Sequence, residues 1–166
     1  MKRKIFIIGF FIMGVFTGCQ LDITPTAKVE GLLSEYQMLD KDISISYIDL
    51  SNDNNIIDEY KDRYEDLIRR QYRNMSYEIK DEEIDGENAI VTAQIEVIDY
   101  QKVLDQYNND FNENEYHDKI LEKLEEAKDK ITYTIEFNVI MNENGNWKVK
   151  QLSQEEKGKL LGINND

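Results

Sequence analysis

The only thiol in this chain belongs to Cys19, within the stretch VFTGCQ at residues 15–20. A single cysteine excludes an intramolecular disulfide and any site built from paired cysteine ligands. A thiol also serves as a point of covalent attachment, so the sequence around Cys19 carries its interpretation.

His117 is the only histidine, which excludes a metal site with two histidine ligands. It lies in a stretch rich in Asn and Glu, and this setting predicts a surface residue. Ser76 or Ser153 together with a histidine and an aspartate would supply the residue types of a hydrolytic triad. Neither serine lies in the sequence of a nucleophile elbow, so no triad is expected.

Asp99 is the best catalytic candidate because it closes an otherwise apolar strand and is followed by Tyr100. An aspartate in a dry pocket can act as a general base or a general acid. The alternative is a helix cap, since Asp is a preferred N-cap and the helical sequence YQKVLDQY follows. The cap is the favoured interpretation, and the chain is expected not to be an enzyme.

Two acidic stretches, 81–88 and 108–118, offer oxygen atoms of the kind that bind calcium. Neither fits the EF-hand loop. Counted from Asp110, Glu115 stands where that loop has Gly, and Leu121 stands where it has the closing Glu. A solvated turn and a solvated helix end are expected instead, and no metal or cofactor is predicted.

Five aromatic residues are candidates for a pocket lining. Aromatic rings with polar tips at the mouth of a pocket would suit a small amphipathic ligand or a peptide. The alternative is that they belong to the hydrophobic core. The residues are Tyr36, Tyr64, Tyr77, Tyr133 and Trp147.

The N-terminus explains the lone cysteine. A positive segment, residues 2–4, precedes the uncharged run 5–16, which is shorter than the ~20 residues of a membrane-spanning helix. The ending FTGC resembles the lipobox of bacterial lipoproteins, although Leu is usual where Phe16 stands. The resemblance implies cleavage before Cys19 and lipid attachment to its thiol. It predicts a cleaved signal at 1–18, a lipidated tether at 19–24 and anchorage at the extracytoplasmic face of the cell membrane.

Helical spacing marks four parts of the mature chain. Thr24 and Pro25 suit the start of a first helix, and residues 56–75 carry a second apolar face. Helical spacing returns over 103–127, where the stretch 108–118 either loosens or interrupts it. A short helix is expected in the tail after Ser153, while 43–50 is ambiguous.

Alternating apolar and polar residues predict two long β-hairpins. Asp85-Gly86 marks the turn of the first, between strands at 75–84 and 89–100. Asn144-Gly145 marks the turn of the second, between a strand at 131–141 and a long return strand that Trp147 and Val149 open. The expected fold class is α+β, with helices on one face of one antiparallel sheet.

The order of these elements resembles the NTF2-like lipoproteins of low-GC Gram-positive bacteria, of the DUF4878 and DUF5105 type. The likeness rests on the lipobox, the N-terminal helix pair, MSYEIKDEEIDGENAIVTAQIEVIDY and the closing ENGNWKVKQL. It covers roughly residues 25 to 163 and implies a single NTF2-like, cystatin-like cone with a bent sheet around helices. The helical segment between the two hairpins departs from that pattern.

Charge limits the partners. The chain carries 34 acidic and 20 basic residues, a net charge of −14; cleavage before Cys19 removes three basic residues and no acidic one, which gives −17. Such a surface repels phosphate backbones, so nucleic acid is not an expected partner. A membrane-anchored binding or interaction module is the leading hypothesis. An NTF2-like hydrolase or isomerase using Asp99, or a structural protein of the cell envelope, are the alternatives, and the oligomeric state stays open.

Overall fold

The computed structural model describes residues 24–38, 58–107 and 113–163. Within these residues the chain forms five helices and one four-stranded antiparallel sheet, which confirms the α+β class. Cys19 and the ambiguous segment 43–50 lie outside the described residues. The elements are α1 (Pro25–Met38), α3 (Asp58–Asn74), β1 (Ser76–Asp85), β2 (Asn88–Ile98), α4 (Tyr100–Tyr107), α5 (Glu113–Glu126), β3 (Lys130–Met141), β4 (Trp147–Val149) and α6 (Gln154–Leu161).

Helix α1 begins where the sequence predicted. The Thr24 hydroxyl accepts a hydrogen bond from the backbone N–H of Ala27 at 3.1 Å, and Pro25 takes the first helical position. A second acceptor comes from the sheet, because Glu82 of β1 accepts from the N–H of Thr26 at 2.8 Å. This carboxylate lies at the positive end of the helix dipole and joins α1 to β1.

Helix α3 buries the face that its spacing predicted. The buried residues of this helix are spaced mostly three and four apart in the sequence, so they lie on one side of it. Residues 56 and 57, the first two of the predicted helical segment, lie outside the described residues. The buried members are Tyr60, Tyr64, Leu67, Ile68 and Tyr72.

The first hairpin, β1–β2, is confirmed. Gly86 takes a positive φ of 59° in the turn, a conformation that favours glycine. The strand order is β1-β2-β3-β4, so β2 and β3 form the centre of the sheet. One face of β2 is buried throughout, at Ala89, Val91, Ala93, Ile95 and Val97.

The expectation of a long second hairpin is wrong in its return strand. Gly145 (φ 76°) forms the predicted turn, but β4 has three residues, against twelve in β3. After Lys150, whose N–H still donates to the Asn138 carbonyl of β3, the chain leaves the sheet, and a capping box starts α6. In this box the Ser153 hydroxyl accepts from the Glu156 N–H at 3.1 Å, and the Glu156 carboxylate accepts from the Ser153 N–H at 2.6 Å.

The middle helical segment is divided into two helices. Helix α4 ends at Tyr107 and α5 begins at Glu113, and the two pack on each other. The interruption therefore falls within the stretch where the sequence left it open. Residues 108–112 lie outside the described residues.

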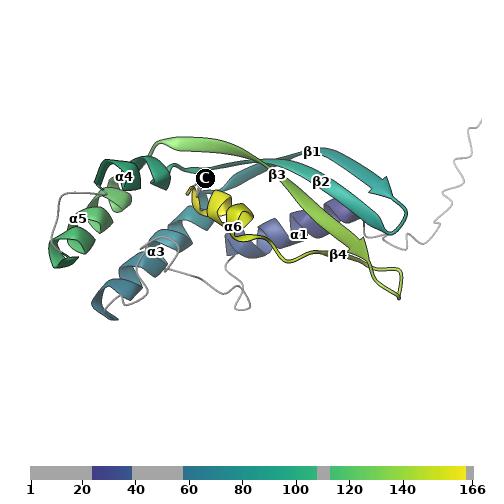
Figure 1. Ribbon diagram of the computed structural model, residues 1–166, viewed down its shortest axis with the longest axis horizontal. Coiled ribbons are helices and arrows are strands. Elements are labelled where there is room, and N and C mark those ends of the chain that lie inside the picture. Colours follow the sequence, from purple (N-terminus) through teal and green to yellow (C-terminus); the bar gives the residue numbers. More distant parts are fainter. Residues whose placement is uncertain (1–23, 39–57, 108–112, 164–166) are drawn as a thin grey trace, which may run out of the picture.

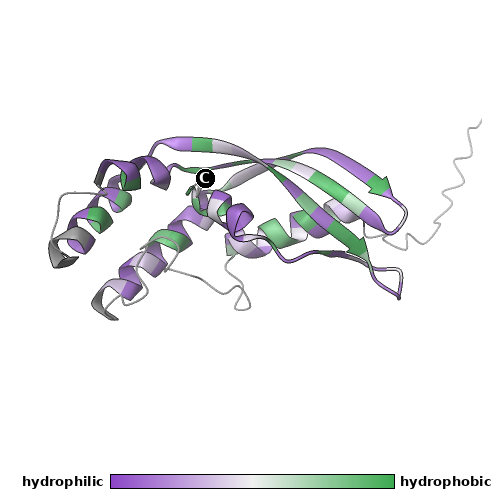
Figure 2. Ribbon diagram, viewed as in Figure 1, coloured by the Kyte–Doolittle hydropathy of each residue, from purple (hydrophilic) through white to green (hydrophobic). Residues whose placement is uncertain are grey.

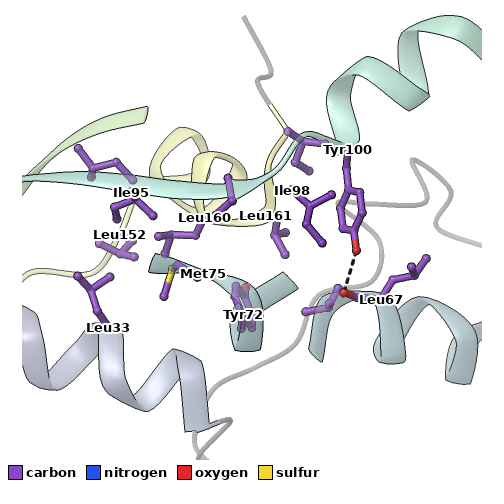
Figure 3. Packing of buried hydrophobic residues seen from close by; sticks show 14 of the residues in the cluster. Leu33, Leu67, Tyr72, Met75, Ile95, Ile98, Tyr100, Leu152, Leu160 and Leu161 are labelled. Carbon is purple, nitrogen blue, oxygen red and sulfur yellow. Dashed lines mark hydrogen bonds between the residues drawn. The ribbon is translucent and has the colours of Figure 1, made fainter. Parts of the chain in front are cut away.

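The helices divide into two groups in space. Helices α1, α3 and α6 lie on one side of the sheet, whereas α4 and α5 lie beyond one of its ends (Figure 1). Hydrophilic and hydrophobic residues alternate along the strands (Figure 2). Helices and sheet meet in one hydrophobic cluster, where Leu33 of α1, Ile95 of β2 and Leu160 of α6 converge (Figure 3).

Candidate functional site

Asp99 caps helix α4. Its carboxylate accepts a hydrogen bond from the Lys102 N–H at 3.0 Å, and its own N–H donates to the Asp129 carbonyl at 2.8 Å. The capping interpretation of Asp99 is therefore confirmed. The Asp99 side chain is half-buried and borders an open cleft. It therefore lacks the dry surroundings in which a carboxyl group serves as a general acid or base.

The cleft beside Asp99 is charged on both sides. It has a volume of about 400 Å³ and lies between α4 and the end of α5. Lys102 pairs with Asp129 at 2.5 Å, and Lys123 pairs with Glu126 at 2.7 Å. The hydrogen bond to Lys102, and then its charge, lower the pKa of Asp129, while the same contact raises the pKa of Lys102. A carboxylate with a lowered pKa is a weaker base, so Asp129 is a poor candidate for a general base.

His117 is buried, so the expectation of a surface residue is wrong. Its exposed fraction is 5%, and its Nδ1 lies 3.1 Å from the Tyr64 hydroxyl. The Tyr60 ring packs on the imidazole, with 5.1 Å between ring centres. The polar neighbours in the sequence were misleading because helical spacing places His117 on the same face as Ile120, Leu121 and Leu124, all of which are buried.

Both serines considered for a triad have structural contacts. Ser153 is the N-cap of α6, and the Ser76 hydroxyl donates to Glu96 across the β1–β2 pair at 3.4 Å. His117 contacts Tyr64, which lies on α3. These contacts lend no support to a hydrolytic triad.

The five aromatic candidates do not gather around one pocket. Tyr64 lies in the core, and the other four are partly buried against it, so core packing, the alternative weighed from the sequence, describes all five. Tyr36 meets Tyr72 edge to face at 5.0 Å between ring centres, and burial raises the pKa of Tyr36. Tyr77 also borders a cleft of about 330 Å³ with Glu78, Gln94 and Glu96. A part in ligand binding stays a prediction for these residues.

The acidic stretches serve the fold where the structure describes them. Glu82 caps α1, and Asp118 lies 3.5 Å from the Arg63 guanidinium. Among the described residues, no three His, Cys, Asp or Glu side chains are arranged to hold a metal ion.

No family model, no curated protein and no solved structure matches this chain. Within the described residues, no helix combines the length and the apolar character needed to cross a membrane.

Gln71 is a buried polar residue that the sequence analysis did not identify. Its amide nitrogen donates to the carbonyls of Ile98 and Leu161, each at 2.7 Å, and its amide oxygen accepts from the Ile98 N–H at 2.9 Å. One side chain thus joins α3, the end of β2 and the end of α6. Its spacing from the buried Leu67 and Ile68 is the sequence signal that indicates the core-facing side of α3.

Proposed function

We propose that this protein is a lipid-anchored, extracytoplasmic lipoprotein whose α+β domain is a binding or interaction module. The observation that carries the proposal is the order of the N-terminal parts. A positive segment, an apolar run and FTGC are followed by the start of α1 at Pro25, six residues after Cys19. This order leaves room for a short tether and no further domain between the anchor and the fold.

Simple energetics supports the anchor. Each buried CH₂ of an acyl chain contributes ~0.8 kcal/mol, so two chains on Cys19 would hold the protein firmly to a bilayer. The acidic body would be repelled by anionic lipids, with a net charge of −17 once the signal is removed from the chain of −14. The domain would therefore stand off the membrane surface and face other molecules of the envelope.

The contacts of the catalytic candidates favour an interaction module over an enzyme. Asp99 and Ser153 cap helices, and His117 is held by Tyr64 in the interior. Each of these side chains thus has a structural task. An open, charged cleft and a solvent-facing sheet surface are features that docking uses.

The assignment of the domain to the NTF2-like fold is part of the same proposal. Helices gathered on one side of an antiparallel sheet agree with an NTF2-like cone, and the pair α4–α5 between β2 and β3 is the departure from that pattern. A fold of this kind serves several functions, so it adds nothing on the ligand.

The test is the mass of the protein purified from the membranes of its own host. The wild type should lack residues 1–18, carry the mass of a lipid and remain with the membrane. Cys19→Ala should carry no lipid and leave the membrane fraction, whereas the neighbouring Thr17→Ser should behave like the wild type. An unlipidated wild type, or a Cys19→Ala protein with an unchanged mass and location, would refute the proposal.

A further inference from the structure

Strand β3 has a long unpaired edge in the described part of the chain. Strand β4 pairs only with Val139–Met141, while the whole of β3, from Lys130 to Ile140, pairs with β2 on its other side. The chain after β4 diverges from β3 and leads to α6 (Figure 1). Among the described residues, no strand pairs with Thr132, Thr134 or Glu136 on the side away from β2.

The register identifies which backbone groups face away from β2. Met141 donates to the Glu87 carbonyl at 2.8 Å, and Asp99 donates to the Asp129 carbonyl at 2.8 Å, so odd-numbered residues of β3 bond to β2. Residues in an antiparallel strand alternate in the side to which they bond. The N–H and C=O groups of Thr132, Thr134 and Glu136 thus point away from β2, the direction in which the Asn138 carbonyl accepts from Lys150 at 2.8 Å.

The opposite edge of the sheet is protected, which makes the β3 edge distinctive. Strand β1 has a register irregularity between Ile79 and Asp81 and carries many charged side chains. Bulges and charges are the devices by which proteins keep edge strands from pairing. The β2–β3 register is regular, and ITYTIEFN (131–138) contains a single charged residue, Glu136.

A groove accompanies this edge. It has a volume of about 460 Å³ and lies between β3, from Thr134 to Asn138, and the start of α6. Glu136, Glu155 and Glu156 border it, against one basic residue, Lys159, which pairs with Glu155 at 2.5 Å. The groove is therefore acidic, and a second copy of the same acidic edge would meet it with like charge.

We propose that the β3 edge binds an extended, basic peptide segment of a partner protein, which adds as a further strand beside α6. The exposed N–H and C=O groups would hold the peptide backbone, and Glu136, Glu155 and Glu156 would attract its Lys or Arg side chains. The inference rests on the proposed function for the place where the partner is met, and it names the class of that partner.

The test uses the full chain purified from membranes in detergent. The probe is a labelled peptide of about eight residues, the length of an ordinary strand, in which Lys alternates with Thr. A peptide in which Glu alternates with Thr is the charge control. Binding is followed by fluorescence anisotropy, and the amides of 131–138 by hydrogen exchange. We expect the Lys peptide to bind and to slow exchange at Thr132, Thr134 and Glu136, and the Glu peptide to bind at least tenfold more weakly.

Thr134→Pro removes an outward N–H without removing a bond to β2, and its matched control is Thr134→Ala. We expect Thr134→Pro to weaken the binding of the Lys peptide by about tenfold or more, whereas Thr134→Ala should leave its affinity unchanged. Should the proline variant not fold, Glu136→Lys with Glu155→Lys replaces it, because this pair leaves the capping contact of Glu156 with Ser153 in place, and we expect it to reverse the preference between the two peptides.

Three results would overturn the inference. They are equal binding to the proline and alanine variants, equal binding of both peptides, and amides of Thr132, Thr134 and Glu136 that are already protected without peptide. Light scattering on the same sample distinguishes pairing with a second copy from coverage by the same chain. The lipid mass of the sample is measured in parallel. A lipidated protein that does not bind the peptide would refute this inference and leave the proposed lipid anchor intact.

Discussion

At the scale of single residues, the junction of Gln71 and Gly162 joins three elements. Gln71 supplies the only polar amide side chain in the described core, and its three hydrogen bonds reach β2 and α6. Gly162 follows α6 in the left-handed region, with φ 72°, and its N–H donates to the Lys159 carbonyl. The backbone there approaches β2 so closely that a side chain has no room.

Gly162→Ala should therefore destabilise the protein strongly. A Cβ atom at this position would lie 1.9 Å from the Ile98 carbonyl oxygen and 2.4 Å from the Gln71 amide nitrogen. We expect a loss of about 3 kcal/mol or more in the free energy of unfolding, measured with urea.

Gly145→Ala is the matched control, because Gly145 also has a positive φ of 76° but no atom within 4 Å of the position that a Cβ would take. It should lose only the ~1–2 kcal/mol of the left-handed backbone. Equal losses in the two variants would show that the Gly162 contact is not the cause.

At the scale of elements, α5 is held mainly by other helices in the described structure. It packs on α4 and α3 beyond the end of the sheet (Figure 1). The Arg70 guanidinium donates to the carbonyls of Leu124, Glu125 and Ala127, and so satisfies the end of α5. Arg63 adds a 2.8 Å ion pair to Glu125.

Arg70→Met should loosen α5 without disturbing the sheet. The variant keeps an apolar stem and loses every hydrogen bond to the last carbonyls of α5. We expect hydrogen exchange across 117–126 to speed up by about tenfold or more, while β2 and β3 exchange as before.

Arg69→Met tests whether any lost arginine has this effect, since Arg69 makes a 3.7 Å pair with Glu65 one turn earlier on the same helix. It should leave the exchange of α5 unchanged. Faster exchange in β2 and β3 of Arg70→Met would mean that α5 and the sheet open together.

At the scale of the whole molecule, net charge dominates the electrostatics. The chain has 34 acidic and 20 basic residues, and its described ion pairs lie mostly between exposed side chains. Exposed pairs contribute little, so mutual repulsion of the excess carboxylates outweighs them.

Salt should therefore stabilise this protein. Between about 0.01 M and about 0.1 M salt the Debye length falls from about 30 Å to about 10 Å, which screens repulsion across the molecule. We expect the midpoint of urea unfolding of the full chain to rise over this range, equally in sodium chloride and potassium chloride. A falling midpoint would show that local ion pairs dominate, and a difference between the two salts would point to specific ion binding.

Local sequence determined much of this fold. Thr24 with Pro25 and Ser153 with Glu156 mark helix starts within four residues, Gly86 and Gly145 mark turns, and the face of α3 follows from spacing along one helix. Caps, turns and periodicity depend on neighbours in the chain, so the sequence displays them directly. The proposed anchor at Cys19 is of the same kind, because a lipobox is a local pattern.

Tertiary structure alone decided the remainder. His117 looked exposed among polar neighbours, but it is buried because α5 packs that face on Tyr60 and Tyr64 of α3. Gln71 is buried for a similar reason, since its partners lie 27 and 90 residues away. Among the described residues, most of β3 has no strand on the side away from β2, because β4 has only three residues. Each of these features depends on elements distant in the chain, and their packing decides which groups are buried and which remain available to a partner.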